Sequence, residues 1–169
     1  MSNIAELRAG IAHDLLDRRN REGLWTGRLS SSAVSTATAC CALHLAGGVE
    51  HLPLVVKAQD FLCENMNADG GWGDTPESPS NITATILGYA ALKSSSSPDT
   101  IQGREAAERF LIKRFGGITP EHIVRGILDA YGNDMTFSAP ILALCAAVGI
   151  IPWKNVPRLP FELALLPAG

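Results

Sequence analysis

A repeat with a period of 47 residues constrains the fold of this chain more than any other feature of its sequence. Gly23-Leu24-Trp25 recurs 47 residues later as Gly70-Gly71-Trp72. The same offset relates two further matched pairs: Leu15 and Leu62, and Thr36-Ala37-Thr38 and Thr83-Ala84-Thr85. A period of about 20–50 residues is typical of stacked supersecondary units, each of which buries its apolar face against its neighbours.

Each repeat is predicted to be a helix, a turn that carries Gly-x-Trp, and a second helix. Apolar residues of the second copy recur at three- and four-residue steps, namely Leu54, Val55, Ala58, Phe61 and Leu62. Residues 67–71 then interrupt the helix with Asn, Asp and Gly, which favour tight turns. No segment shows strand-like alternation. We therefore expect an all-α fold of stacked helical hairpins, with helices over residues 3–19, 31–46, 51–65, 80–93, 101–114, 120–131 and 137–148.

The 169 residues are predicted to form a single partial domain, a length that suffices to bury a core. In the third copy Gly116-Gly117 stands in place of Gly-x-Trp, and no tryptophan follows. The predicted organisation is a domain over 1–169 with repeats at about 3–50, 51–97 and 98–150, followed by a proline-rich segment at 151–169.

Composition excludes several classes of function. Charged residues make up 18% of the chain, the net charge is −3, and no basic cluster marks a nucleic-acid surface. No apolar run reaches the length of about 18 residues that spans a bilayer. The four cysteines form no C-x-x-C pair, and three lie in apolar stretches, where free cysteine packs as a small hydrophobe. We expect a cytoplasmic protein that needs no cofactor or metal.

The turn regions resemble a known motif. Lys57-Ala58, Phe61-Leu62, Met66 and Gly70-Gly71-Trp72 are spaced like the QW motif of squalene-hopene and oxidosqualene cyclases. In that comparison Met66 stands where the family has glutamine, and Asn20 is assigned to the same position in the first copy. The resemblance implies structural roles within the repeats for six residues: Asn20, Gly23, Trp25, Met66, Gly70 and Trp72.

The C-terminal stretch from Ile151-Pro152-Trp153 to Leu166-Pro167 resembles the proline-spaced segment that follows the first repeats of these cyclases. The resemblance covers the whole chain but only the N-terminal part of a cyclase. It implies a partial α/α toroid, in which Trp153 and Phe161 are candidates for a cavity wall or an interface. Residues 161–166 are candidates for peripheral membrane contact.

The family resemblance does not supply a catalytic acid. Cyclases of this class protonate their substrate with an Asp-x-Asp-Asp motif, since clustered carboxylates hold one acid protonated and polarised. The sequence contains no such motif and no adjacent aspartates, so we assign no catalytic residue. Asp69 and Asp74 flank the second Gly-x-Trp and are interpreted as turn and loop-anchoring residues. The tryptophans that recur at the repeat offset are interpreted as packing residues.

Two functions are compatible with these residues. The first is a module of the triterpene cyclase family that builds the barrel and part of the cavity wall but lacks the proton donor. Its partners would be an isoprenoid or triterpene ligand and either the remainder of a cyclase or a second copy. The alternative is a stand-alone toroid that binds an isoprenoid or a protein partner. Whether the chain is an enzyme is left open by the sequence.

Overall fold

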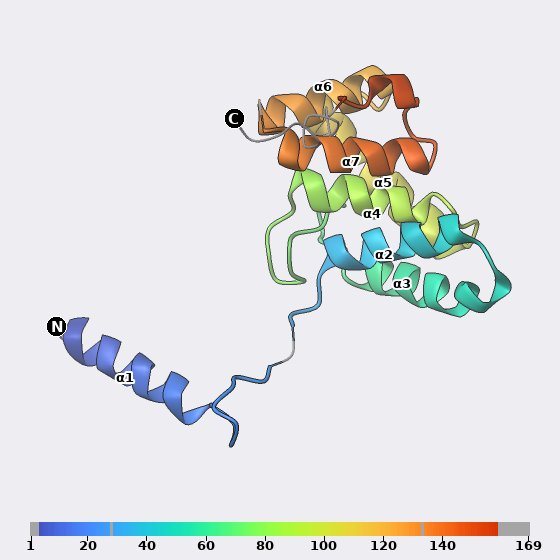
Figure 1. Ribbon diagram of the computed structural model, residues 1–169. Helices are drawn as coiled ribbons and strands as arrows, with labels where there is room; N and C mark the ends of the chain where they lie inside the picture. Colours follow the sequence, from blue (N-terminus) through green and yellow to red (C-terminus); the bar gives the residue numbers. More distant parts are fainter. Residues whose placement is uncertain (1–3, 28, 133, 159–169) are drawn as a thin grey trace, which may run out of the picture. The chain divides into compact units, whose positions relative to one another are not determined.

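The computed structural model describes residues 4–27, 29–132 and 134–158 (Figure 1). Within these ranges it contains seven α-helices, two short 3-10 helices and two isolated β-bridges, and no strand. The predicted all-α class is therefore confirmed. The chain divides into two compact units, one that ends at Ser30 and one that begins at Ser31, and each is described here by itself.

The first unit contains one helix and one turn. Helix α1 (Ile4–Asp17) carries apolar residues at three- and four-residue steps, namely Ile4, Leu7, Ile11 and Leu15, and none of its residues is buried. The chain then turns back, and the indole of Trp25 bonds to the backbone of the helix. This unit is the first half of a predicted repeat.

The second unit contains the other six helices: α2 (Ala33–Ala46), α3 (Leu52–Glu64), α4 (Ile82–Leu92), α5 (Pro98–Phe115), α6 (Pro120–Tyr131) and α7 (Met135–Ala147). The 3-10 helices are η1 (Val49–His51) and η2 (Trp153–Asn155). Five of the six α-helices begin at a side chain that accepts a bond from the first turn: Ser32, Asn81, Ser97, Thr119 and Asp134. The observed helices agree with the predicted ones to within a few residues.

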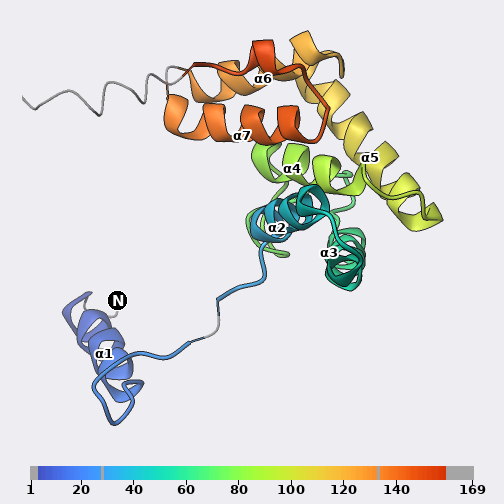
Figure 2. The same ribbon diagram turned by 45° about the vertical axis from the view of Figure 1, so that its right-hand side comes forward.

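Helix α4 is the centre of the second unit. It packs against α2, α5 and α7, while α3 packs on α2 and α6 packs on α7. Figures 1 and 2 show the hairpins α2/α3, α4/α5 and α6/α7 following one another in a layered stack, so the second Gly-x-Trp turn joins two hairpins and does not lie inside one. Because neighbours cover it on several sides, α4 is apolar around its circumference. Its buried residues are Ala84, Thr85, Ile86, Leu87, Gly88, Ala90, Ala91 and Leu92.

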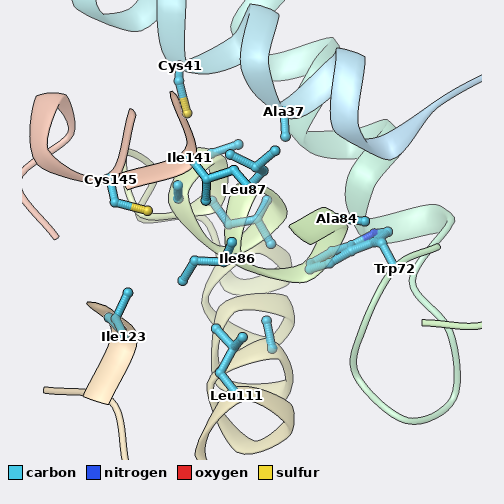
Figure 3. Close-up of a cluster of buried hydrophobic side chains, with 14 of the residues drawn as sticks. Ala37, Cys41, Trp72, Ala84, Ile86, Leu87, Leu111, Ile123, Ile141 and Cys145 are labelled. Atoms are coloured by element: carbon cyan, nitrogen blue, oxygen red, sulfur yellow. The ribbon is translucent and has the colours of Figure 1, made fainter. Parts of the chain in front are cut away.

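Three helices meet in the core. Side chains of α2, α4 and α7 converge there, as Figure 3 shows for Cys41, Ile86, Leu87, Ile141 and Cys145. The cysteines are free, and burial raises the pKa of the Cys41 and Cys145 thiols to about 12. They pack as small apolar side chains, as predicted. Among the described residues no helix is long and apolar enough to cross a membrane.

Candidate functional site

The second Gly-x-Trp turn links α3 to α4. The backbone N–H of Asn67 donates to Gly71 O over 2.9 Å, and Gly70 N–H donates back to Asn67 O over 2.9 Å. Gly70 has φ +84°, and a Cβ there would lie 2.5 Å from the carbonyl oxygen of Ala106 in α5. Only glycine fits this conformation and this approach. The turn therefore lies directly against α5.

Trp72 ties α3 to α4. Its side chain is 1% exposed, and its indole Nε1 donates to Leu62 O over 2.8 Å. Its backbone N–H donates to Thr85 Oγ1 over 3.1 Å. The ring lies against Gly88, where a Cβ would come within 2.7 Å of the indole Cε3. Figure 3 shows the indole beside Ala84. A single side chain thus joins the end of one helix to the face of the next.

The two aspartates of this turn hold backbone and side-chain groups. Asp69 Oδ1 accepts bonds from Gly71 N–H (3.1 Å) and Ser80 Oγ (2.6 Å). Asp74 Oδ1 accepts from Asn81 Nδ2 over 2.9 Å, and Asn81 Oδ1 in turn caps α4. Both carboxylates are engaged in fixing the loop, which agrees with their interpretation as turn and loop-anchoring residues.

The first Gly-x-Trp turn repeats the same hydrogen bonds 47 residues earlier. Asn20 N–H donates to Leu24 O (2.8 Å), and Gly23 N–H donates to Asn20 O (3.0 Å). Trp25 Nε1 donates to Leu15 O over 2.5 Å, the counterpart of the Trp72 bond. Unlike Trp72, Trp25 is 57% exposed. Within the first unit taken by itself, the local geometry recurs without the burial.

These bonds correct the predicted alignment of the two turns by one residue. Because Asn20 makes the backbone bonds that Asn67 makes in the second copy, Arg19 and not Asn20 is the counterpart of Met66. The guanidinium of Arg19 lies 5.7 Å from the centre of the Trp25 ring. The side chain of Asn20 instead accepts bonds from two backbone N–H groups inside its own turn. The glutamine position is thus occupied by Arg19 and Met66.

The structure describes one of the two C-terminal candidates, Trp153. Trp153 lies in η2, where its side chain is 62% exposed. Phe161 lies outside the described residues. The roles of both residues in a cavity wall or an interface stay predictions.

A cavity of about 600 Å³ lies beside the second turn, and sequence reasoning missed it. Its lining consists of Val34, Asp74, Ser80, Asn81, Ile82, Thr83, Arg114, Ala130, Tyr131 and Phe137. Tyr131 and Phe137 stack with their ring centres 5.7 Å apart, and the Tyr131 hydroxyl is hydrogen-bonded to Thr83. No local motif signals this cavity, because its wall combines the connection between α3 and α4 with residues from five helices, α2, α4, α5, α6 and α7.

Comparison with known proteins gives a consistent result. The family model described as the squalene-hopene cyclase N-terminal domain matches residues 9–169. The probable squalene–hopene cyclase of Sinorhizobium fredii is 24% identical over 163 residues, which cover 94% of this chain and 22% of the relative. The squalene–hopene cyclase of Alicyclobacillus acidocaldarius is 29% identical over 152 residues, covering 90% and 21%.

A third relative has a different overall organisation. The terpene cyclase–glycosyl transferase fusion protein of Humicola fuscoatra is 28% identical over 154 residues, which cover 86% of this chain and 10% of the relative. No solved structure matches the chain significantly. The chain spans 22% or less of the length of the three relatives described here.

Fold and comparisons together define the class. The helices of the second unit stack as hairpins, and the buried Trp72 joins α3 of one hairpin to α4 of the next. The family match identifies this stack as part of an α/α toroid. The chain belongs to the family of squalene-hopene cyclase N-terminal domains.

Proposed function

We propose that this chain builds the first hairpins of the barrel of a triterpene-cyclising enzyme and contributes cavity wall, but not the proton that starts the reaction. The observation that carries this proposal is the family match over residues 9–169. The buried Trp72 brace supports it, because such a brace holds successive hairpins in a fixed order.

The residues that line the cavity beside the second turn are better suited to forming a cavity wall than to donating a proton. The stacked rings of Tyr131 and Phe137 offer π faces, which stabilise nearby positive charge. The carboxylate of Asp74 is held by Asn81 and anchors the loop. A proton donor for an alkene needs a cluster of carboxyl groups that keeps one of them protonated. In this proposal the acid comes from outside these residues.

The test uses two proteins. The chain alone and a chimera, in which it replaces the N-terminal domain of the Alicyclobacillus acidocaldarius relative, are each incubated with squalene, and products are separated by gas chromatography. We expect cyclic triterpene from the chimera and none from the chain alone. Cyclisation by the chain alone would contradict the assignment of the acid elsewhere. A chimera that folds by circular dichroism yet forms no product would contradict the role as a barrel module.

A stand-alone binding toroid is the second candidate. The observation that favours it is a group of exposed apolar side chains on α3: Leu52, Leu54 and Val56 are each more than half exposed. Such a surface favours association with a partner, a second copy or a membrane surface. We expect the isolated chain to self-associate in light scattering, whereas a monomer at all concentrations would count against an open apolar face. Cytoplasmic location with peripheral membrane contact belongs to either proposal and is tested by cell fractionation.

A further inference from the structure

Three basic side chains of α5 form an exposed group: Arg109, Lys113 and Arg114. Arg109 and Lys113 lie one helical turn apart, and Arg114 is next to Lys113. Like charges at this spacing destabilise a helix. None of the three makes an ion pair within the described residues. The helix dipole favours the two cations of the last turn, but Arg109 lies before that turn. We call these three residues the basic edge.

Arg114 connects the basic edge to the apolar cavity. It lines a hollow of about 250 Å³ together with Arg109 and Lys113, and it also lines the cavity of about 600 Å³ beside the second turn. Its guanidinium lies 5.3 Å over the ring of Phe110. Stacking occupies a face of the guanidinium and leaves the N–H donors in its plane available for an acceptor.

The carboxylates of both hollows are already engaged. Asp69 lies in the smaller hollow and accepts bonds from Gly71 and Ser80. Asp74 lies in the larger cavity and accepts from the side chain of Asn81. Among the residues that line these two hollows, three cations outnumber the two anions, which favours an anionic group there. Arg109 also lines a separate hollow with Asp60, Glu64 and Asp99, which shares no lining residue with the cavity that Arg114 lines.

The apolar side of the cavity is open. Phe137 is 57% exposed although it stacks on Tyr131, and Ile82 and Val34 lie in the same lining. A volume of about 600 Å³ lies within the range of about 300–1,000 Å³ that small-molecule sites occupy. An apolar chain in this cavity would cover the side chain of Phe137, which is otherwise exposed to solvent.

We infer that the basic edge and this cavity together bind a free single-chain amphiphile, with a phosphate or carboxylate head on Arg109, Lys113 and Arg114 and its apolar chain along Tyr131 and Phe137. A hydrocarbon substrate has no group for the basic edge. The inference therefore goes beyond the proposed function and is tested separately from it.

Isothermal titration calorimetry of the full chain tests the inference with three probes below their critical micelle concentrations: decyl phosphate, decanol and inorganic phosphate. We expect decyl phosphate to bind about tenfold or more tightly than decanol, because charge-assisted hydrogen bonds are worth more than that factor. Inorganic phosphate alone should bind weakly. Equal affinity for decyl phosphate and decanol, or equal affinity for decyl phosphate and inorganic phosphate, would overturn the inference.

Variants separate the head site from the chain site. Arg114→Gln combined with Lys113→Gln should weaken decyl phosphate about tenfold and leave decanol unchanged, whereas Phe137→Ala should weaken both. Arg104→Gln, on the same helix but outside both hollows, is the matched control and should change neither. All variants alter exposed or partly exposed side chains, and circular dichroism checks their folding.

Sedimentation with vesicles distinguishes a free amphiphile from a bilayer. We expect no difference between vesicles of phosphatidylcholine alone and vesicles that also contain phosphatidic acid. Binding to the anionic vesicles without binding to monomeric decyl phosphate would overturn the assignment to a free ligand, as would a double variant that binds decyl phosphate like the parent chain.

Discussion

The two Gly-x-Trp turns are alike in hydrogen bonding and unlike in burial. In both, the indole donates to the backbone carbonyl of a leucine ten residues earlier, Leu15 for Trp25 and Leu62 for Trp72. Yet the side chain of Trp72 is 1% exposed and that of Trp25 is 57% exposed. The shape of the turn is thus encoded within a short segment, whereas burial of the indole depends on a further helix.

The second turn has that helix within its own compact unit. Helix α4 offers Gly88, which lies under the indole ring, and Thr85, which accepts from the backbone N–H of Trp72. The first unit contains only α1 beside its turn. Tryptophan burial removes a large apolar area from water. The two turns must therefore contribute differently to the free energy of unfolding, even though their hydrogen bonds match.

Truncating each tryptophan should show this difference most clearly. We expect Trp72→Ala to lower the free energy of unfolding by about 3–5 kcal/mol, since it leaves a cavity between α3 and α4. Trp25→Ala should lower it by less than about 1 kcal/mol, as for other exposed positions. Guanidinium unfolding followed by circular dichroism measures both. Equal losses would mean that the shared hydrogen bond, and not burial, carries the stability.

Adding a methyl group under the buried indole is the next largest test. Gly88→Ala places a Cβ 2.7 Å from the ring of Trp72, and such overpacking costs about 1–3 kcal/mol. The control is Gly10→Ala in α1, where a Cβ meets no atom within 4 Å. There the higher helix propensity of alanine should raise the helical signal. If Gly88→Ala unfolds at the parent's denaturant concentration, the indole does not press on α4 as described.

A smaller loss of stability is expected at the Thr85 hydroxyl, which accepts a hydrogen bond from the backbone N–H of Trp72. Thr85→Val removes the acceptor and leaves a buried N–H unpaired, which should cost about 1–2 kcal/mol. The counterpart 47 residues earlier is Thr38, which is exposed and donates only to Val34 O within its helix. Thr38→Val should change stability by less than about 0.5 kcal/mol. Similar losses at the two positions in chemical denaturation would argue against a special role for Thr85.

The smallest predicted effect concerns the exposed turn. Arg19→Ala removes the guanidinium from the Trp25 ring, an exposed contact worth about 0.5–1 kcal/mol. We expect faster amide hydrogen exchange at Leu24 and Asn20, which belong to the same turn. Unchanged exchange at both amides would show that the guanidinium does not support this turn.

Much of the fold follows from the sequence. The ends of the helices could be predicted because capping and helix-breaking residues are local signals. Asn81 caps α4, and Gly116 ends α5 in a left-handed conformation. The roles of Asp69 and Asp74 were accessible for the same reason. The assignment of Asn20 to the glutamine position was wrong by one residue. The 47-residue offset itself, which relates Asn20 to Asn67, was the signal that places Arg19 opposite Met66.

Other features depend on packing between distant segments. Gln59 is 4% exposed and donates to Ala91 O and Ser94 Oγ, which satisfies a carbonyl at the end of α4. A glutamine in an amphipathic helix gives no hint of this in the sequence. The difference in exposure between Trp25 and Trp72 could not be predicted from the sequence either, because both repeats contain the same Gly-x-Trp motif. Burial depends on neighbours, which a local pattern does not specify.

The bond from each indole to its leucine closes a loop of fixed length. Leucine and tryptophan are ten residues apart in both copies. The offset of 47 residues continues to Thr36-Ala37-Thr38 and Thr83-Ala84-Thr85, so the connection after the tryptophan also has one length in both copies, although α4 begins two residues later in its copy than α2 does. A residue inserted between the leucine and the tryptophan would disrupt the indole bond, whereas one inserted after the tryptophan would leave that bond in place, which marks the stretch after the tryptophan as the place to splice foreign loops into this fold.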